Sequence, residues 1–407
     1  MISSSTALMI AKYAFGATVT ATTLAAGGLW FFQRHLIYPA YVPDGSRKHV
    51  PKPIELGMPY EDVTITCRDG TKIKGYVIPA RLKPITTDEM RTMNTAERKD
   101  RVGKEMERWA EEMGDEKSIE YAKSRPTVVI FHANAGNMGH RVPLARKFNV
   151  DFGCNIFMLS YRGYGLSEGK PSEHGECTVL DPTAMEYILA HPILGETKIV
   201  LYGQSLGGAA CLYAGSRYSD QITGIIVENT FFSLSTLIPL VLPQIPKFLL
   251  PILLTEHWDA QHTIPLIPST TPFLMISGKQ DDLVKPSQMI SIRHLREQNG
   301  GRVQWFSLDG GHNDTCLQPG YWGIIGDWLK IEIEALYRPP PPPPPPSEPS
   351  SVGEGSKGSV EQDEKNDSTE TGSTTGSSSG NGEEDYHKIT REEAMEVEAA
   401  EEGKKDV

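Results

Sequence analysis

The sequence lacks the motifs by which most metal and nucleotide sites are recognised. It has no HExxH pair of histidines, no GxxxxGK[ST] phosphate loop and no cluster of cysteine and histidine at metal-ligand spacing. Only five of its 407 residues are cysteines, an odd number at wide spacing and without a CxxC pair. These absences argue against a disulfide framework, and we expect neither a metal nor an organic cofactor.

Positive charge is scarce relative to negative charge, and the imbalance has one source. The net charge is −12, and residues 347–407, with 17 acidic against 6 basic side chains, carry −11 of it. The rest of the chain is close to neutral, so no basic excess indicates a nucleic-acid partner. Residues 338–407 include eight consecutive prolines followed by a tail rich in Ser, Gly and Glu. We expect a polyproline II spacer, typical of SH3- or WW-domain ligands, and then a disordered tail.

One long stretch near the N-terminus lacks charge altogether. Residues 13–33 contain no charged side chain and are bracketed by Lys12 and Arg34. As a helix, this run spans about 30 Å, which is enough to cross a bilayer. We predict a single-pass membrane anchor over residues 1–35; a cleaved signal peptide and a weakly bound amphipathic segment are the alternatives. Basic residues are more numerous after the run than before it, which favours the cytosolic side for the rest of the chain.

The middle of the chain has an α/β pattern. Two alternating runs within residues 61–79 flank Arg68-Asp69-Gly70 and predict a β-hairpin. Six short apolar runs follow, at residues 127–131, 155–161, 198–202, 222–228, 272–277 and 302–308. Helix-length segments separate most of them, which predicts a mostly parallel sheet with helices on both faces. We expect one α/β domain over residues 36–337.

Two segments interrupt this pattern. Residues 81–125 are highly charged and lack a broad apolar face, so we expect an exposed insertion containing a solvated helix. Residues 231–271 are apolar and contain six prolines, which limits any helices to short lengths. The second segment is interpreted as a small lid inserted between two strands, with an irregular connector as the alternative.

Ser205 lies in Gly203-Gln204-Ser205-Leu206-Gly207, which matches GxSxG. The pattern alone is weak, but here it directly follows a predicted strand and directly precedes a helical segment. A strand-turn-helix elbow exposes the serine hydroxyl at the carboxyl edge of the sheet, where the helix N-terminus favours developing negative charge. We therefore identify Ser205 as the candidate nucleophile.

A serine hydroxyl needs a base, and in this arrangement an acid and then a histidine follow it along the chain. His312 lies in a glycine-rich loop after the last predicted strand and is the candidate base. Asp281 follows the preceding strand and is the preferred orienting acid, because it stands three residues after Gly278 and shortly before an apolar pair. The adjacent Asp282 is the alternative.

An oxyanion hole requires two backbone N–H groups close to the nucleophile. Leu206, directly after Ser205, is the first candidate, and the loop after residue 131 supplies the second. We choose Asn134, with Ala133 as the alternative, and expect His132 to pack and hydrogen-bond beneath the loop. Residues 228–231 end a strand, and they either line an acyl pocket or only begin the lid.

Several sequence runs together resemble a known family. HANAGNMGHR, YRGYGLSEG, GQSLGGA, VENTF, SGKQDDLVKP and GGHNDT occur in this order. They resemble the α/β-hydrolase domain-containing protein 13 family and the related fungal bud-emergence-type hydrolases, which are membrane-anchored. The resemblance implies an α/β-hydrolase fold with a triad of Ser205, Asp281 and His312. A related branch contains protein depalmitoylases, so acyl-thioester hydrolysis is also implied.

The chain departs from this family at the candidate oxyanion loop. It has His132-Ala133 where relatives usually carry His-Gly, so an added methyl group must fit the turn. The charged insertion and the acidic tail also look additional to the family pattern, and the resemblance implies no role for them.

These features predict a serine hydrolase that cleaves carboxylic ester or thioester bonds through an acyl-enzyme. The apolar lid and the anchor favour acylated small molecules, lipids or proteins as substrates at a membrane surface. Two alternatives remain open. One is a peptidase similar to serine aminopeptidases, and the other is a catalytically silent membrane scaffold whose tail recruits partners.

Overall fold

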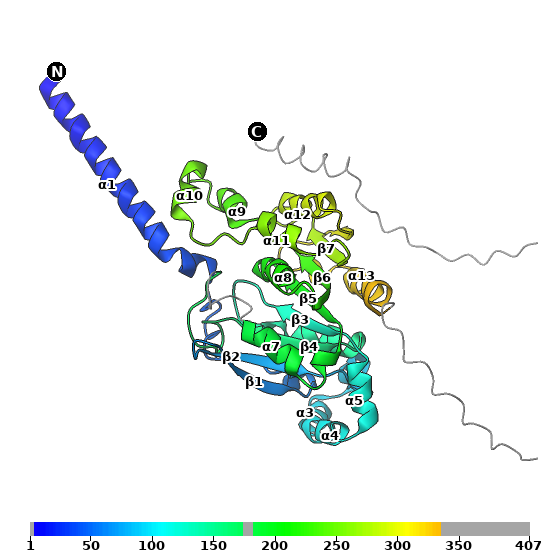
Figure 1. The fold of residues 1–407 in the computed structure, drawn as a ribbon. Helices are drawn as coiled ribbons and strands as arrows, with labels where there is room; N and C mark the ends of the chain where they lie inside the picture. The colour runs from blue at the N-terminus through cyan, green and yellow to red at the C-terminus, as the bar shows by residue number, and fades with distance from the viewer. Residues whose placement is uncertain (1–3, 174–181, 335–407) are drawn as a thin grey trace, which may run out of the picture. The chain divides into compact units, whose positions relative to one another are not determined.

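A computed structural model describes residues 4–173 and 182–334; the proline run and the acidic tail lie outside the described residues. An eight-stranded sheet forms its centre, with strand order β1-β2-β4-β3-β5-β6-β7-β8 (Figure 1). The strands are β1 Glu61–Thr66, β2 Lys72–Ile78, β3 Thr127–Phe131, β4 Asn155–Ser160, β5 Ile199–Gln204, β6 Ile222–Glu228, β7 Phe273–Gly278 and β8 Val303–Leu308. The hairpin β1–β2 joins β4 antiparallel, and β4, β3 and β5 to β8 run parallel. The predicted mostly parallel α/β-hydrolase sheet is therefore confirmed.

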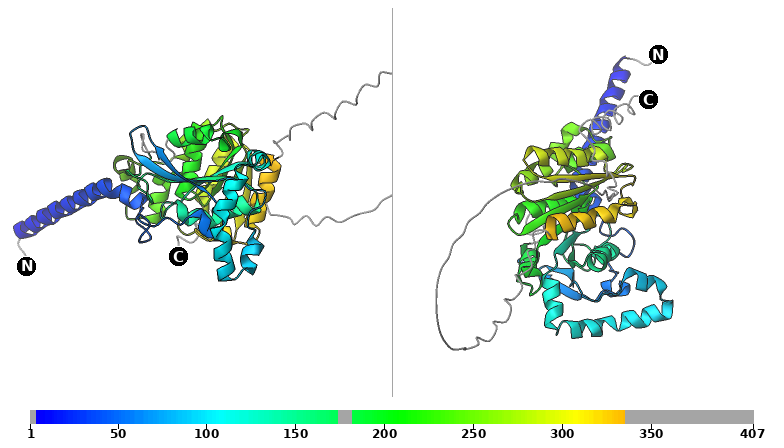
Figure 2. Two further views of the ribbon diagram at one scale, coloured as in Figure 1. Left: turned by 90° about the horizontal axis from the view of Figure 1, so that it is seen from below. Right: turned by 90° about the vertical axis from the view of Figure 1, so that its right-hand side faces the viewer.

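Helices cover both faces of this sheet, as Figures 1 and 2 show. On one face lie α7 Pro182–Ala190, α8 Leu206–Arg217 and α12 Pro286–Gln298, and on the other lie α6 Val142–Arg146 and α13 Tyr321–Trp328. The central strands are apolar at consecutive positions because both faces are buried. In β3, Val129 and Phe131 belong to one core cluster, and Val128 and Ile130 belong to the other.

The segment expected to be a lid contains only short helices. These are α9 Leu234–Val241, α10 Leu250–Leu253 and α11 Ala260–Thr263, placed between β6 and β7. Prolines set these lengths, because a proline ring removes an N–H donor and clashes with the preceding turn. Pro239 lies inside α9, and α10 has a proline in its first turn.

The uncharged N-terminal run forms one long helix, α1 Ser4–Ile37. Within it, Leu8–Ile37 is long and apolar enough to cross a membrane, by length and composition. The helix therefore begins before and ends slightly after the charge-free run. Its last turn contacts the lid: the Gln33 side chain hydrogen-bonds to residues at the end of α10, and Arg34 pairs with Glu256 at 2.7 Å.

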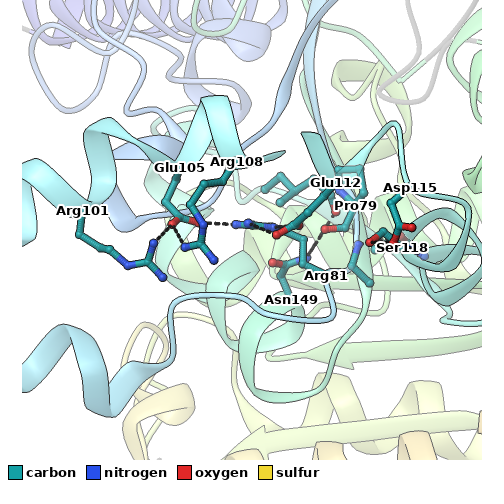
Figure 3. Close-up of polar contacts among 12 residues, drawn as sticks. Pro79, Arg81, Arg101, Glu105, Arg108, Glu112, Asp115, Ser118 and Asn149 are labelled. Atoms are coloured by element: carbon teal, nitrogen blue, oxygen red, sulfur yellow. Dashed lines mark hydrogen bonds and ion pairs between the residues drawn. The ribbon is translucent and has the colours of Figure 1, made fainter. Parts of the chain in front are cut away.

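The charged insertion contains four short helices, α2 Thr87–Thr92, α3 Thr95–Gly103, α4 Glu105–Glu112 and α5 Glu116–Lys123. Most of its surface is exposed as expected, but its inner side corrects the expectation of a solvated helix. The Arg81 and Glu105 side chains are almost fully buried and form an ion pair of 2.5 Å (Figure 3). Arg81 also binds both carboxylate oxygens of Glu112, at 2.7 and 2.8 Å.

Glu105 has two further cationic partners, Arg101 at 2.7 Å and Arg108 at 2.6 Å (Figure 3). Isolated charges cannot be buried without large desolvation costs, so this cluster holds the insertion against the domain only while it is complete. Helical periodicity did not reveal the cluster, because its members come from the segment after β2 and from two successive helices, α3 and α4.

We expect Arg81→Met to lower the free energy of unfolding by on the order of 3 kcal/mol, because Glu105 and Glu112 lose their shared buried partner. Urea denaturation of the detergent-solubilised protein measures this change. The matched control is Lys104→Met, which removes an exposed pair with Asp100 and should cost less than about 1 kcal/mol. Equal effects of the two substitutions would contradict a structural role for the buried cluster.

Candidate active site

Ser205 occupies a strained turn between β5 and α8. Its φ of 57° is unusual for a residue with a side chain and is typical of a nucleophile elbow. The backbone is crowded on both sides. A Cβ at Gly203 would lie 2.1 Å from the Gly207 carbonyl oxygen, and one at Gly207 would lie 2.4 Å from that of Phe131. Only glycine fits these two positions, which explains the spacing of the motif.

The turn is anchored to the neighbouring strand β6. The Ser205 N–H donates to the Glu228 carbonyl at 3.0 Å, and the Thr230 hydroxyl donates to the Ser205 carbonyl at 2.7 Å. Both contacts involve the serine backbone and leave its hydroxyl to the cavity above. Strain at such a turn persists only where surrounding contacts hold it.

The structure brings Asp281, not Asp282, against His312. His312 Nδ1 lies 2.8 Å from Asp281 Oδ2, and the two side chains are 11% and 1% exposed. The other carboxylate oxygen, Oδ1, accepts the N–H groups of Leu283 at 3.0 Å and Val284 at 2.8 Å. The Asp282 side chain is 98% exposed and lies 3.7 Å from the Lys285 ammonium.

These contacts define what the imidazole can do. With its proton on Nδ1, the His312 imidazole donates a hydrogen bond to Asp281 and keeps the lone pair on Nε2. Ser205, Asp281 and His312 follow β5, β7 and β8, whose carboxyl ends meet at one edge of the sheet. A buried carboxylate paired with a histidine is one part of the arrangement that general-base catalysis uses.

A cavity of about 220 Å³ opens above the elbow and is lined by Ser205, Leu206 and Asn134. Its remaining walls are almost entirely aliphatic and come from the lid, the α12 entry and the end of α1. They are Leu29, Gln33, Leu36, Ile37, Phe231, Leu234, Leu237, Ile238, Val241, Leu242, Ile245, Leu250, Leu253, Leu254, Leu283 and Val284. Such a site suits an apolar group joined to a single polar centre.

The candidate oxyanion loop is held from below by aromatic side chains. The Asn134 carbonyl accepts the Tyr164 hydroxyl at 2.7 Å, and the Tyr161 hydroxyl donates to the His132 carbonyl at 2.6 Å. His132 stacks on Tyr161 with ring centroids 3.7 Å apart, and burial lowers its pKa to about 3. His132 is therefore buried and neutral, and it packs beneath the loop as we expected. Ala133 has no left-handed φ, so its methyl group fits the turn.

Comparisons with known proteins agree with this geometry. Residues 126–250 match the family model described as alpha/beta hydrolase fold. Protein bem46 of Schizosaccharomyces pombe is 37% identical over 80% of this chain and 95% of its own length. The chain belongs to the α/β-hydrolase family that includes Bem46. The resemblance to bud-emergence-type hydrolases seen in the sequence is thereby confirmed.

Two further proteins are similar to this chain. A Saccharomyces cerevisiae protein named "Uncharacterized membrane protein YNL320W" is 33% identical over 79% of this chain and 96% of its own length. Among solved structures, an esterase of Pyrococcus furiosus is 17% identical with a TM-score of 0.49, covering 70% of this chain and 98% of that one.

In this Bem46-family chain, Asn229 is the site residue that sequence reasoning missed. It directly follows β6 and has a φ of 45°, which asparagine tolerates better than most residues. Its amide Nδ2 donates to the carbonyls of Gly311 at 3.1 Å and His312 at 3.3 Å, and its Oδ1 accepts the Gly278 N–H at 2.7 Å. The amide therefore links the end of β7, before Asp281, to the loop that carries His312. The VENTF run was the available signal, but spacing alone did not give its role.

The sequence left open whether the other residues of the VENTF run line an acyl pocket or only begin the lid, and the structure differs between them. Phe231 lines the cavity, whereas Glu228 is buried beneath the elbow. Glu228 Oε2 accepts the hydroxyls of Tyr202 and Tyr321, at 2.8 and 2.5 Å, and burial raises the pKa of its carboxyl group. Within residues 4–173 and 182–334, no group of three His, Cys, Asp or Glu side chains is placed to hold a metal ion.

We expect Asn229→Ala to destabilise the protein by on the order of 3 kcal/mol, because the Gly278 N–H and the carbonyls of the His312 loop lose their partner. Urea denaturation measures the change. Asn229→Gly relieves the positive φ and should still destabilise, which separates the amide contacts from backbone strain. Asn299→Ala is the matched control, because its side chain is exposed and donates once, to Leu295. If Asn229→Ala is no worse than this control, the linking role is wrong.

Proposed function

We propose that this protein is a membrane-associated serine hydrolase that cleaves carboxylic ester or thioester bonds through an acyl-enzyme. The observation that carries the proposal is the buried contact between His312 and Asp281 at the sheet edge where the Ser205 turn opens into an apolar cavity. A buried acid–histidine contact, a strained backbone turn and an apolar cavity occur together there, and this combination is typical of an active site.

The reaction follows from the roles of these groups. Ser205 Oγ attacks the acyl carbonyl carbon while His312 Nε2 takes the hydroxyl proton, and Asp281 stabilises the resulting imidazolium. The N–H groups of Leu206 and Asn134 stabilise the oxyanion, since Leu206 begins α8 and Asn134 lines the same cavity. The tetrahedral intermediate then collapses, and the alcohol or thiol leaves with the proton from His312. Water, activated by His312, attacks the acyl-enzyme, releases the carboxylic acid and restores the serine.

The substrate class follows from the cavity and from α1. Aliphatic walls stabilise an acyl chain by removing it from water, at about 0.8 kcal/mol for each methylene group. A helix able to span a bilayer would keep the site at the membrane surface, where acylated lipids and proteins are concentrated. Protein depalmitoylation is one reaction of this class, supported by the family resemblance. The basic residues after α1 favour a cytosolic catalytic domain.

A fluorophosphonate probe tests the nucleophile directly. We expect the full-length protein to be labelled in detergent and the Ser205→Ala variant to show no labelling, as read by in-gel fluorescence. Equal labelling of the two proteins would reject Ser205, and absence of labelling in both would favour a catalytically silent scaffold. Hydrolysis of peptide amides without hydrolysis of acyl esters or thioesters would favour a peptidase.

The two adjacent aspartates provide a matched test of the acid. We expect Asp281→Asn to lower kcat on p-nitrophenyl esters by about 10⁴-fold, because the amide stabilises the wrong histidine tautomer and no imidazolium. Asp282→Asn should change kcat by no more than about twofold, since its side chain is 98% exposed. Comparable losses in both variants would show that Asp281 has no specific role in orienting His312.

A further inference from the structure

The last turns of α1 contribute to the cavity that contains Ser205. Leu29, Gln33, Leu36 and Ile37 all line it, although they lie some 170 positions before the serine. Their spacing places them on one face of the helix. Trp30, Phe31 and Phe32, which lie between them in the sequence, do not line the cavity. One face of the candidate membrane helix is therefore turned toward the candidate active site.

Specific hydrogen bonds fix this face against the lid. The Gln33 amide donates to the Leu253 carbonyl at 3.0 Å and accepts the Thr255 N–H at 2.9 Å. It thus pairs with the backbone on both sides of the end of α10. Gln33 is only 8% exposed, and a buried amide without such partners would be costly. These contacts use the polar atoms of the Gln33 side chain. The other polar residues that line the cavity are Ser205 and Asn134.

A buried carboxylate strengthens the same attachment. Glu256, just after α10, is fully buried and accepts Arg34 Nε at 2.7 Å and the Tyr38 hydroxyl at 2.6 Å. Trp258 Nε1 in turn donates to the Tyr38 oxygen at 2.8 Å. Because a buried charge requires several well-placed partners, this set of contacts holds the end of α1 at one position on the lid.

Another wall of the cavity comes from α9 and α10. Leu237 and Ile238 of α9 line it, as does Leu254, directly after α10. Outside the cavity, Phe248 and Ile252 of the same lid are about three-quarters exposed, at 76% and 75%. An exposed apolar lid beside an apolar helix is suited to hydrocarbon rather than to water.

We propose that α1 is one wall of the acyl-binding site, and that the long acyl chain of the substrate lies between α1 and the α9–α10 lid with its carbonyl at Ser205. The inference rests on the proposed hydrolase function and adds its specificity determinant. Leu29, Leu36 and Ile37 then select acyl chains by length. The chain enters from the bilayer that surrounds α1, so that a long-chain ester or thioester can reach Ser205 without crossing water.

The test uses a substitution on α1 that makes the cavity narrower. In the full-length protein reconstituted in phosphatidylcholine vesicles, kcat/KM is measured for p-nitrophenyl butyrate and palmitate. We expect Leu29→Trp to lower the palmitate-to-butyrate ratio by about ten-fold or more, because the larger side chain occupies space needed by the distal methylene groups. The matched control is Leu24→Trp, the same substitution on the same helix at a residue that is 71% exposed and does not line the cavity. It should keep the wild-type ratio.

Fluorophosphonate labelling of each variant separates the outcomes. If the wild-type protein is not labelled, the proposed hydrolase function fails. If the wild-type protein and Leu29→Trp are both labelled and have the same palmitate-to-butyrate ratio of kcat/KM, the proposed hydrolase function stands but α1 is not a wall of the acyl site. If Leu29→Trp is not labelled, Leu29→Ala is measured in its place. Its palmitate-to-butyrate ratio should then differ from that of the matched control Leu24→Ala. An unchanged ratio there also overturns the inference, as does an equal change at position 24.

Discussion

The geometry of the candidate site depends on the side-chain amide of Asn229. Three consecutive strands, β6, β7 and β8, end at the same edge of the sheet, and the loops after β7 and β8 share a backbone hydrogen bond from the Gln280 N–H to the Gly310 carbonyl at 2.9 Å. The Asn229 amide adds a side-chain link, because it donates to the His312 loop and accepts from the end of β7. A residue that has no chemical role in the proposed reaction therefore helps to hold His312 and Asp281 in place.

The same edge contains the strained Ser205 turn, and the two features support each other. A positive φ at a residue with a side chain is stable only if its neighbours hold it. Here Glu228, the last residue of β6, binds the N–H of Ser205, and Thr230, two residues later, binds its carbonyl, with Asn229 between them. Strand β6 thus connects the nucleophile on one side with the acid and base on the other. This position explains why the strand ends in buried polar residues rather than in aliphatic ones.

Two clusters of buried charge attach segments that the central sheet does not organise. Arg81 and Glu105 attach the charged insertion, and Glu256 attaches the end of α1 to the lid. Both clusters are surrounded by several hydrogen-bond partners, which is the condition under which buried ions are tolerated. The second cluster has the larger consequence, because it positions a helix with membrane-spanning properties beside the candidate nucleophile. In the proposed function, substrate selection and membrane attachment are properties of one assembly of α1, lid and elbow.

The sequence by itself determined the parallel sheet and the elbow. Both depend on local signals: apolar runs long enough for buried strands, and glycines at the two positions where a Cβ would collide with backbone. The order of Ser205, Asp281 and His312 along the chain was also readable, since each follows a strand. Asp281 and Asp282 were harder to separate, because neighbours with the same charge differ only in the direction of their side chains. Only the folded loop turns one toward His312 and the other into solvent.

Tertiary structure alone decided the role of Asn229, the burial of Arg81 and Glu105, and the presence of α1 in the cavity wall. Each depends on partners that are distant in sequence, up to 222 positions apart for Arg34 and Glu256. Periodicity and composition report the average environment of a segment, whereas these contacts depend on where separate segments meet. A polar side chain that reads as solvated in the sequence is buried once the fold brings its partners to it.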